Sequence, residues 1–370
     1  MTEQILDTES LSRSERIEGR LARLLGGLPG PWLLKLIGEQ PRVIDGLTLD
    51  AHVQFILAAR RRKRSALMSG PTPSAARRRN RREIHAVTIG AGARPTRVRS
   101  VRDLDIDGAA GTLAARHYAP PSSGVDVPEP LLVFFHGGGF VICDLDTHDE
   151  ACRILCRTAG MHVLSVAYRL APEHPFPAAP EDCYAAARWA QEHATELGAD
   201  AARISLGGDS AGANLAAVTA LALARDARPV AAQLLIYPTT DAGAQHASLR
   251  LFSDGFVLTA ADLLAFQEHY LGAAFEQTRS DPRVSPARSP DLAQSPATLL
   301  ITAGFDPLRD EGDVFATTLH SLGVTVRAHR EDSLVHGFLH LTTVVPAAHA
   351  AVERIARSFR QLVDMSNPSS

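Results

Sequence analysis

The chain has 370 residues, of which 45% are hydrophobic and 21% charged, with a formal net charge of −3. These values are typical of a soluble globular protein with one large domain plus an accessory segment, or with two average domains. The first thirty residues lack the apolar core of a signal peptide, and no apolar run reaches the length of a membrane span, so stable membrane insertion is excluded.

The cysteines are expected to be reduced. The spacing of the four, Cys143, Cys152, Cys156 and Cys183, matches no zinc or redox motif. Cys152 and Cys156 lie one helical turn apart, which is poor geometry for a disulfide. We therefore expect buried thiols and a cytoplasmic location.

Residues 1–58 are predicted to be helical. Apolar residues recur at helical spacing between Ile17 and Leu25 and again between Asp45 and Leu57, on either side of a Gly- and Pro-rich break at 26–31. We expect residues 1–60 to form a helical arm that lies on the main domain as part of a cap, and not a domain with its own core.

A strongly basic stretch follows this arm. Residues 60–99 contain thirteen basic residues and one acidic residue, Glu83, and the run at 59–82 is interrupted by Ser-Gly-Pro-Thr-Pro-Ser at 69–74. One interpretation is a contact for acidic lipid or nucleic acid. We favour a solvated helix end and a mobile linker, because no aromatic residues are interleaved at 59–82 to stack on bases. Residues 61–97 are therefore assigned as a basic linker or cap extension, and no nucleic-acid partner is expected.

From Val98 the pattern changes to alternating strands and helices. A hairpin is predicted at 101–104 and 113–118, around Asp107-Gly108. A loop at 120–130 precedes apolar runs that predict buried strands at 131–135, 163–168, 232–236, 298–303 and 324–329, with a further strand starting at Arg203. Helices are predicted at 148–159, 181–196 and 345–365. This alternation favours an α/β fold over residues 98–370, with a mostly parallel sheet flanked by helices.

The alternation stops between Tyr237 and Pro296. Residues 255–275 form a helical patch rich in aromatic and aliphatic side chains. We interpret an insertion at about 240–290 as the second part of the cap, folded over the strand ends. A surface helix packed on the core is the alternative.

The segment Gly208-Asp-Ser-Ala-Gly212 lies where an apolar strand passes into an Ala-rich helix. Ser210 would sit on a sharp strand-to-helix turn with a strained backbone and an exposed hydroxyl. Glycines at 208 and 212 avoid collisions between the crossing strand and helix, and the helix N-terminus favours negative charge beside the serine. The pattern predicts a nucleophilic serine, with an ordinary glycine-rich turn as the alternative.

Three consecutive glycines, within His136-Gly-Gly-Gly-Phe140, directly follow the predicted strand at 131–135. At the end of a strand they can expose adjacent backbone N–H groups. Ester cleavage needs such donors, because the carbonyl oxygen becomes an oxyanion in the tetrahedral intermediate. A flexible loop or a phosphate-binding nest is the alternative, although the Lys-Ser/Thr ending of a P-loop is missing.

A base and an acid must complete such a site. Among fifteen histidines, His336 stands out because it follows the last predicted strand and a short acidic loop. His329 falls within that strand, and His340 falls within the next helical stretch. Position therefore favours His336 as the base.

The acid is expected after the preceding strand. Asp306 lies at the end of that strand, where its carboxylate can reach the Nδ1–H of His336. Asp310 lies a turn into the next helix and suits a capping or salt-bridge role. The chain order is then Ser210, Asp306, His336, which is the order of the α/β-hydrolase scaffold and not that of chymotrypsin or subtilisin.

With these motifs the chain resembles the bacterial hormone-sensitive-lipase-like branch of the α/β-hydrolase esterases. The matching stretches lie in order between about residues 130 and 340. They are 136–140 (HGGGF), 168–182 (YRLAPEHPFPAAPED), 208–216 (GDSAGANLA), 237–238 (YP), 306–312 (DPLRDEG) and 336–338 (HGF).

The resemblance implies an α/β-hydrolase fold and a helical cap made from the N-terminus and an insertion. It implies that Ser210 is the nucleophile, His336 the base and Asp306 its orienting acid. Further residues that it assigns are oxyanion donors on Gly138, Gly139 and Ala211, and His136 as a residue that shapes the Gly loop. The long Arg-rich segment at 60–82 departs from the family pattern.

We therefore expect a carboxylic ester hydrolase that works through an acyl-enzyme and needs no metal or organic cofactor. The aromatic and aliphatic cap residues suggest an enclosed apolar pocket for short- to medium-chain acyl esters. An amidase or deacetylase on the same triad stays open, as does a non-catalytic small-molecule receptor. The expected partner is a small-molecule ester, and a homodimer is left open.

Overall fold

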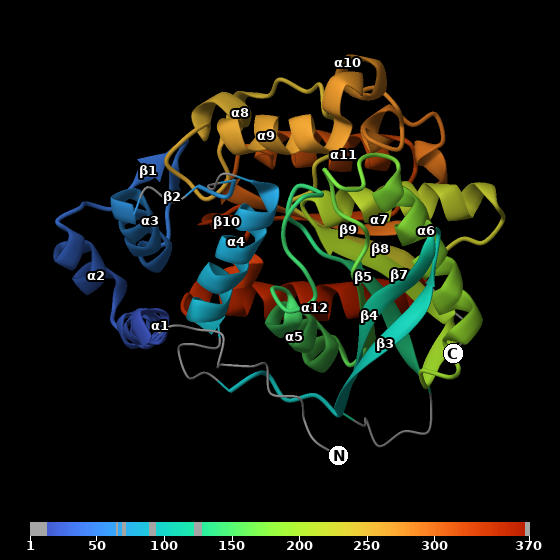
Figure 1. The fold of residues 1–370 in the computed structure, drawn as a ribbon, viewed down its shortest axis with the longest axis horizontal. Coiled ribbons are helices and arrows are strands. Elements are labelled where there is room, and N and C mark those ends of the chain that lie inside the picture. The colour runs from blue at the N-terminus through green and yellow to red at the C-terminus, as the bar shows by residue number, and fades with distance from the viewer. Residues whose placement is uncertain (1–12, 64–65, 69–71, 89–93, 122–127, 367–370) are drawn as a thin grey trace.

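An eight-stranded sheet forms the centre of the computed structural model, which describes residues 13–63, 66–68, 72–88, 94–121 and 128–366 (Figure 1). The strand order is β10-β9-β8-β7-β5-β6-β4-β3. The strands are β3 (Ser100–Gly108), β4 (Gly111–Ala119), β5 (Glu129–Phe135), β6 (His162–Val166), β7 (Ala199–Asp209), β8 (Ala232–Ile236), β9 (Ala297–Phe305) and β10 (Val326–Val335). All neighbours from β6 to β10 pair in parallel, whereas β3 and β4 are antiparallel. The predicted, mostly parallel α/β sheet is confirmed.

Helices cover both faces of the sheet, which explains why its strands are continuous apolar runs. In β5, Leu131, Val133 and Phe135 face one core, while Leu132 and Phe134 face the other. Each buried side chain of this size contributes about 1.5–3 kcal/mol to folding. The first face is covered by α6 (Ala178–His193), α7 (Ala211–Arg225) and α11 (Arg309–Ser321), and the second by α5 (Asp149–Ala159) and α12 (Pro346–Ser366).

The N-terminal arm lies beside the β10 edge of this sheet (Figure 1). It consists of α1 (Arg13–Gly26), α2 (Gly30–Ile37), β1 (Val43–Ile44), β2 (Leu47–Thr48) and α3 (Ala51–Lys63). The backbone N–H of Asp50 donates to the carbonyl of Ser333 in β10 at 2.9 Å, so the arm is joined directly to the sheet edge. The predicted helical residues 1–12 lie outside the described part of the chain.

The prediction of a helix from Asp45 to Leu57 was wrong at its start. Asp45 and Gly46 have φ of 54° and 75° and connect the antiparallel strands β1 and β2. An Asp-Gly pair in this left-handed conformation favours a two-residue hairpin turn over a helix. The helix starts only at Ala51, after Asp50, whose Oδ1 accepts the N–H groups of His52 and Val53.

The favoured interpretation of residues 59–82 as a helix end and mobile linker was wrong from residue 73 onward. Helix α4 (Pro73–Thr88) begins there, and it packs against α1. Residues 64–65, 69–71 and 89–93 of the basic region lie outside the described residues. Arg77 of α4 donates to the carbonyls of Val141 at 2.6 Å and Ala171 at 2.5 Å, and it pairs with Glu173 at 2.6 Å. Arg77 therefore fixes the basic helix α4 to the core.

Acidic partners within and outside the basic stretch offset part of its charge. Glu83 pairs with both Arg60 and Arg79, at 3.2 and 2.9 Å, and Arg61 pairs with Glu39. These are exposed or half-buried ion pairs, so each contributes little to stability. Their main consequence is that part of the local charge is satisfied within the molecule.

The predicted insertion contains short helices that cross the upper side of the view in Figure 1. They are α8 (Ala247–Leu251), α9 (Ala260–Leu271), η2 (Gly272–Ala274), α10 (Phe275–Thr278), η3 (Pro286–Arg288) and η4 (Leu292–Gln294). Thr259 and Asp262 form a capping box that fixes the start of α9. No helix within the described residues is both long and apolar enough to cross a membrane.

Several strand boundaries differ from the predictions; β7, for example, begins at Ala199 and not at Arg203. In the hairpin, Asp107 and Gly108 are themselves paired with Thr112 and Gly111, so the turn lies at 109–110. The strand predicted at 324–329 continues to Val335 and forms the edge of the sheet. After an irregularity between Glu331 and Val335, the last residue of the strand pairs with Phe305 at the end of β9. The short 3-10 helix η5 (Phe338–Leu341) follows.

Replacing Arg77 should loosen α4 from the core. Arg77→Ala removes two charged hydrogen bonds to backbone carbonyls, so we expect a loss of about 2 kcal/mol in the free energy of unfolding. Urea unfolding measures this loss, and limited proteolysis should cut faster around α4. Arg78→Ala is the control, because Arg78 is exposed and donates to Ser74 of the same helix. Equal stability of the two variants would contradict the anchoring role.

Candidate active site

Ser210 lies at the junction between β7 and α7. Its φ and ψ are 54° and −119°, an unfavourable combination for a residue with a side chain. The turn is held because the Ser210 N–H donates to the carbonyl of Ile236 in β8 at 2.8 Å. The residue is 9% exposed. A strained backbone thus presents the hydroxyl at the carboxyl end of the sheet, as the sequence pattern predicts.

The two glycines around Ser210 permit a very close crossing of β5, β7 and α7. A Cβ added to Gly212 would lie 1.9 Å from the carbonyl oxygen of Phe135, and one added to Gly208 would lie 2.4 Å from the same oxygen. Real carbon atoms cannot approach an oxygen so closely. These positions therefore exclude every residue except glycine for steric reasons.

His336 and Asp306 lie in one hydrogen-bonded line with Ser210. The Ser210 Oγ is 2.9 Å from the His336 Nε2, and the His336 Nδ1 is 2.8 Å from the Asp306 Oδ2. Asp306 is fully buried after β9, and its Oδ1 accepts the N–H of Leu308 at 2.8 Å. The carboxylate can orient the imidazole, and the imidazole can accept the serine proton.

The competing residues do not take part in this hydrogen-bonded line. The His329 side chain is 56% exposed and lies 3.3 Å from Glu331. Asp310 pairs with Arg309 at 2.8 Å and accepts the N–H of Ser248, so it has the salt-bridge role expected for it. His340 lies in η5 and lines the same cavity as Ser210 without joining the hydrogen-bonded line.

The Gly loop after β5 lies beside Ser210. Gly138, Gly139 and Ala211 line the same cavity as Ser210. Gly138 and Gly139 have φ of 115° and 59°, which a residue with a side chain rarely adopts. An added Cβ on Gly139 would enter the Phe266 ring. The loop conformation therefore depends on glycine at both positions.

Buried polar groups hold this loop from behind. The Tyr168 hydroxyl donates to the carbonyl of His136 at 2.7 Å, and the two rings stack at 4.5 Å. Burial and the neighbouring His148 lower the pKa of His136 to about 4. A neutral, buried His136 has the loop-shaping environment that the resemblance implies.

Asp209 has a larger role than the sequence indicates. Its Oδ1 accepts the Gly137 N–H at 2.8 Å and lies 3.1 Å from the His148 Nε2. The Tyr237 hydroxyl donates to its Oδ2 at 3.2 Å. Burial alone would raise the pKa of Asp209, but the charge and hydrogen bond of His148 lower it to about 2. This carboxylate therefore stays ionised and holds the start of the Gly loop.

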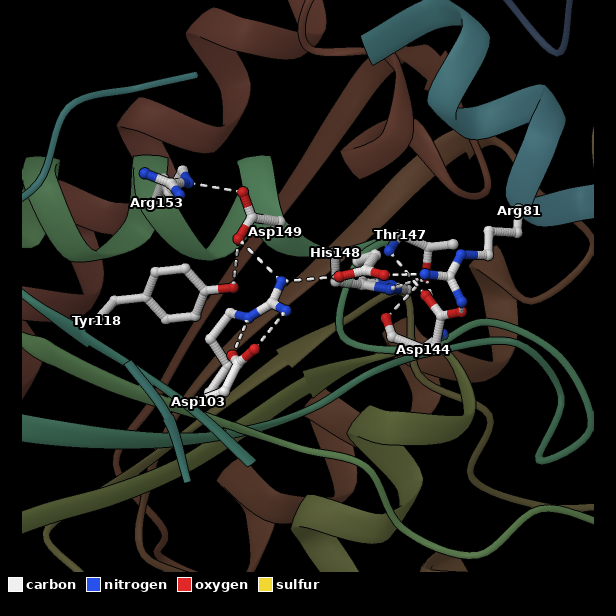
Figure 2. A network of polar contacts seen from close by, with 10 residues as sticks. Arg81, Asp103, Tyr118, Asp144, Thr147, His148, Asp149 and Arg153 are labelled. Atoms are coloured by element: carbon white, nitrogen blue, oxygen red, sulfur yellow. Dashed lines mark hydrogen bonds and ion pairs between the residues drawn. The ribbon is translucent and has the colours of Figure 1, made fainter. Parts of the chain in front are cut away.

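A second polar network fixes the segment that follows the loop (Figure 2). Arg81 reaches down from α4 and pairs with Asp144 at 3.2 Å and with Asp146. Asp146 also pairs with Arg116 of β4 at 2.9 Å, and Arg116 lies 3.3 Å from Asp149 at the start of α5. Ion pairs thus link the basic helix α4 to the segment between the Gly loop and α5. Sequence reasoning missed these partners because they are far apart in the chain.

The cavity around Ser210 is small and mostly apolar. Its volume is about 100 Å³. The predicted cap insertion contributes Phe266 and Tyr270 from α9, and Leu67 comes from the segment assigned as a basic linker or cap extension. The lining includes no described residue of the predicted arm at 1–60. A larger hollow of about 590 Å³ lies between α6 and α7 but contains none of the predicted site residues. The smaller cavity is therefore the candidate active site.

Known proteins resemble the chain along most of its length. A family model described as the alpha/beta hydrolase fold matches residues 132–340. Carboxylic ester hydrolase LipN of Mycobacterium tuberculosis is 42% identical over 359 residues, which cover 94% of this chain and 93% of that protein. Ethyl acetate hydrolase of Pseudomonas putida is 33% identical over 316 residues, covering 85% and 98%. The structure of a hyperthermophilic esterase from Pyrobaculum calidifontis matches with a TM-score of 0.77 and 36% identity, covering 85% and 98%.

A side chain at residue 212 should destroy the packing around Ser210. We expect Gly212→Ala to cost more than about 4 kcal/mol or to give no folded protein, because its Cβ would collide with backbone that cannot move aside. Gly27→Ala is the control, since Gly27 is exposed and an added Cβ would have only an ordinary 3.5 Å contact. Circular dichroism and thermal unfolding compare the two variants. Similar stability would contradict the close crossing.

Proposed function

The chain belongs to the α/β-hydrolase fold family, among its bacterial hormone-sensitive-lipase-like esterases, and is a carboxylic ester hydrolase; we propose that Ser210, His336 and Asp306 carry its reaction. The observation that supports this assignment best is the line of two hydrogen bonds, 2.9 and 2.8 Å long, through the His336 ring. A serine at a strained strand-to-helix turn with this partner has the geometry of an activated nucleophile.

The reaction starts when His336 takes the proton from the Ser210 Oγ, which attacks the acyl carbonyl carbon. Asp306 holds the imidazole in the tautomer that accepts this proton and stabilises the imidazolium. Backbone N–H groups of Gly138, Gly139 and Ala211 are proposed to stabilise the oxyanion, each for roughly 3 kcal/mol. His336 then donates its proton to the leaving alcohol. Water activated by the same imidazole releases the acid and restores the serine.

Short- to medium-chain acyl esters are the proposed substrates. The cavity of about 100 Å³ is lined by apolar side chains from α9 and by Leu67, which suits a small acyl group that is largely removed from water. The similarity to ethyl acetate hydrolase adds support for a short acyl chain. The four free, buried cysteines support a cytoplasmic location.

Two alternatives to this proposal differ in chemistry. An amidase or deacetylase would use the same three residues and the same oxyanion donors. A non-catalytic receptor would have no need for a base beside Ser210, whereas His336 lies within hydrogen-bond distance of its Oγ. The geometry therefore favours a hydrolase over a receptor.

Ser210→Ala should abolish turnover without unfolding the protein. We expect kcat for a short p-nitrophenyl ester to fall by about 10⁴-fold or more, because the nucleophile is removed. Ser205→Ala is the matched control, since Ser205 is buried in the preceding strand β7 and its hydroxyl has no partner among the described residues. Circular dichroism verifies the fold of both. Undiminished turnover by Ser210→Ala would exclude the assignment.

A series of p-nitrophenyl esters should separate the acyl-chain lengths. We expect kcat/KM for the butyrate ester to exceed that for the palmitate ester by at least about tenfold, because the small cavity cannot enclose a long chain. A matched ester and anilide with the same acyl group then test for amidase activity, and the ester should be cleaved faster. Preference for palmitate would refute the chain-length proposal, and preference for the anilide would favour the amidase.

A further inference from the structure

Three side chains that can bind a metal ion converge beside the Gly loop. Among the residues that the structure describes, Cys143, His148 and His340 form one group whose ligand atoms all lie within 4.8 Å of one another. Cys143 and His340 line the cavity that contains Ser210, and His148 is fully buried. None of the three has a step in the proposed ester cleavage.

The distances suit a tetrahedral ion. The His148 Nε2 and the His340 Nε2 are 3.2 Å apart. Two nitrogens bound to one tetrahedral zinc ion, each at about 2.0–2.1 Å, lie roughly 3.3 Å from each other. A thiolate with two imidazoles is also a ligand set that favours Zn²⁺ over Mg²⁺ or Ca²⁺.

The hydrogen positions on the two imidazoles indicate that the His340 Nε2 has a lone pair directed at this group. The His148 Nε2 carries one hydrogen at most, and it lies 3.1 Å from the Asp209 Oδ1 as well as 3.2 Å from the His340 Nε2. Asp209 is a carboxylate and can only accept, so the hydrogen on the His148 Nε2 is donated to the Asp209 Oδ1. The His340 Nε2 must then be unprotonated, because a hydrogen on this nitrogen would be directed at the protonated His148 Nε2. An unprotonated imidazole nitrogen is the form that binds metal.

The backbone of Cys143 gives an independent reason to look for a function. Its φ is 72°, in the left-handed region, which is unfavourable for a residue with a side chain. Glycine would avoid this cost. A thiol is held here at the expense of stability, and it lines the cavity beside Ser210. Backbone strain of this kind concentrates at functional sites.

We propose that Cys143, His148 and His340 bind Zn²⁺ that enters through the substrate cavity, and that the bound ion slows ester hydrolysis. Three protein ligands leave the fourth position of the ion to a water molecule. On binding, the Cys143 thiol gives its proton to solvent and its sulfur bonds to zinc as a thiolate. The hydrogen of the His148 Nε2 is exchanged through solvent to Nδ1, which lies 3.1 Å from the Thr147 Oγ1, so that the Nε2 lone pair is free for the ion. None of the proposed steps of ester cleavage uses this ion, and its place beside the Gly loop leads us to expect inhibition.

The Gly loop explains why occupancy would affect catalysis. Gly138 packs so closely on Cys143 that a Cβ added to Gly138 would lie 3.1 Å from the Cys143 Cβ. On the other side, Asp209 holds the Gly137 N–H and lies 3.1 Å from the His148 Nε2. An ion that takes this nitrogen breaks its contact with Asp209. Binding therefore disturbs the proposed oxyanion donors from both sides and occupies volume in a small cavity.

Cobalt provides a test of binding that does not depend on turnover. The full-length protein is stripped with EDTA and titrated with CoCl₂, and we expect one ion per chain with a near-ultraviolet thiolate-to-cobalt absorption band. Cys143→Ser and Cys143→Gly should lose the band, and the glycine variant should fold well because φ of 72° suits it. Cys152→Ala is the control, since this fully buried thiol lies outside the group. No band in the native protein, or a band that persists in both Cys143 variants, would overturn the site.

Inhibition is then measured against each variant's own metal-free rate. We expect Zn²⁺ to inhibit the native protein and Cys152→Ala, with full recovery on adding EDTA. The Cys143 variants should need at least about tenfold more Zn²⁺ for the same inhibition, because they lack the thiolate ligand. Inhibition at equal Zn²⁺ in all four proteins would assign the effect to another site, for example His336, and would overturn the proposed inhibitory role.

Discussion

The close crossing of β5, β7 and α7 is the constraint on which the rest of the site depends. Gly208 and Gly212 let the helix approach the carbonyl of Phe135 more closely than any side chain would allow. This contact places Ser210 at a strained turn and brings the loop that follows β5 alongside it. Because β7, β9 and β10 are parallel, the residues that follow them gather at the same edge. The Ser210–His336–Asp306 line is therefore a consequence of sheet topology together with glycine packing.

The sequence predicts the core of this arrangement well, because its signals are local. Apolar runs fix the buried strands, and the glycine motifs lie next to the strands that they terminate. Knowing that the strands are parallel is then enough to bring His336 and Asp306 toward Ser210. The hairpin at β1 and β2 was missed for a local reason as well. Leu47 and Leu49 fit a helical period, and that pattern outweighed the turn signal of Asp45-Gly46, which has positive φ at both residues.

The features that the sequence does not predict depend on contacts between distant segments. The charge of residues 59–82 favoured a solvated helix end and a mobile linker, yet Arg77 and Arg81 are held by groups on the loops at 141–146 and 171–173. The same applies to the Cys143 group, whose ligands come from two segments almost two hundred residues apart. No spacing rule detects such a group. The arginine contacts and the Cys143 group both involve residues of the segment that follows the Gly loop. This segment therefore holds the basic helix α4 and also supports the loop that carries the proposed oxyanion donors.

The central claim is that Ser210 attacks the substrate while the Gly loop and Ala211 hold the oxyanion. A crystal structure of the protein inactivated with a short-chain fluorophosphonate tests it most directly. The account predicts phosphorus bonded to the Ser210 Oγ, with the phosphonyl oxygen about 2.7–3.1 Å from the backbone nitrogens of Gly138, Gly139 and Ala211. Labelling of another residue, or a phosphonyl oxygen directed away from these nitrogens, would contradict it.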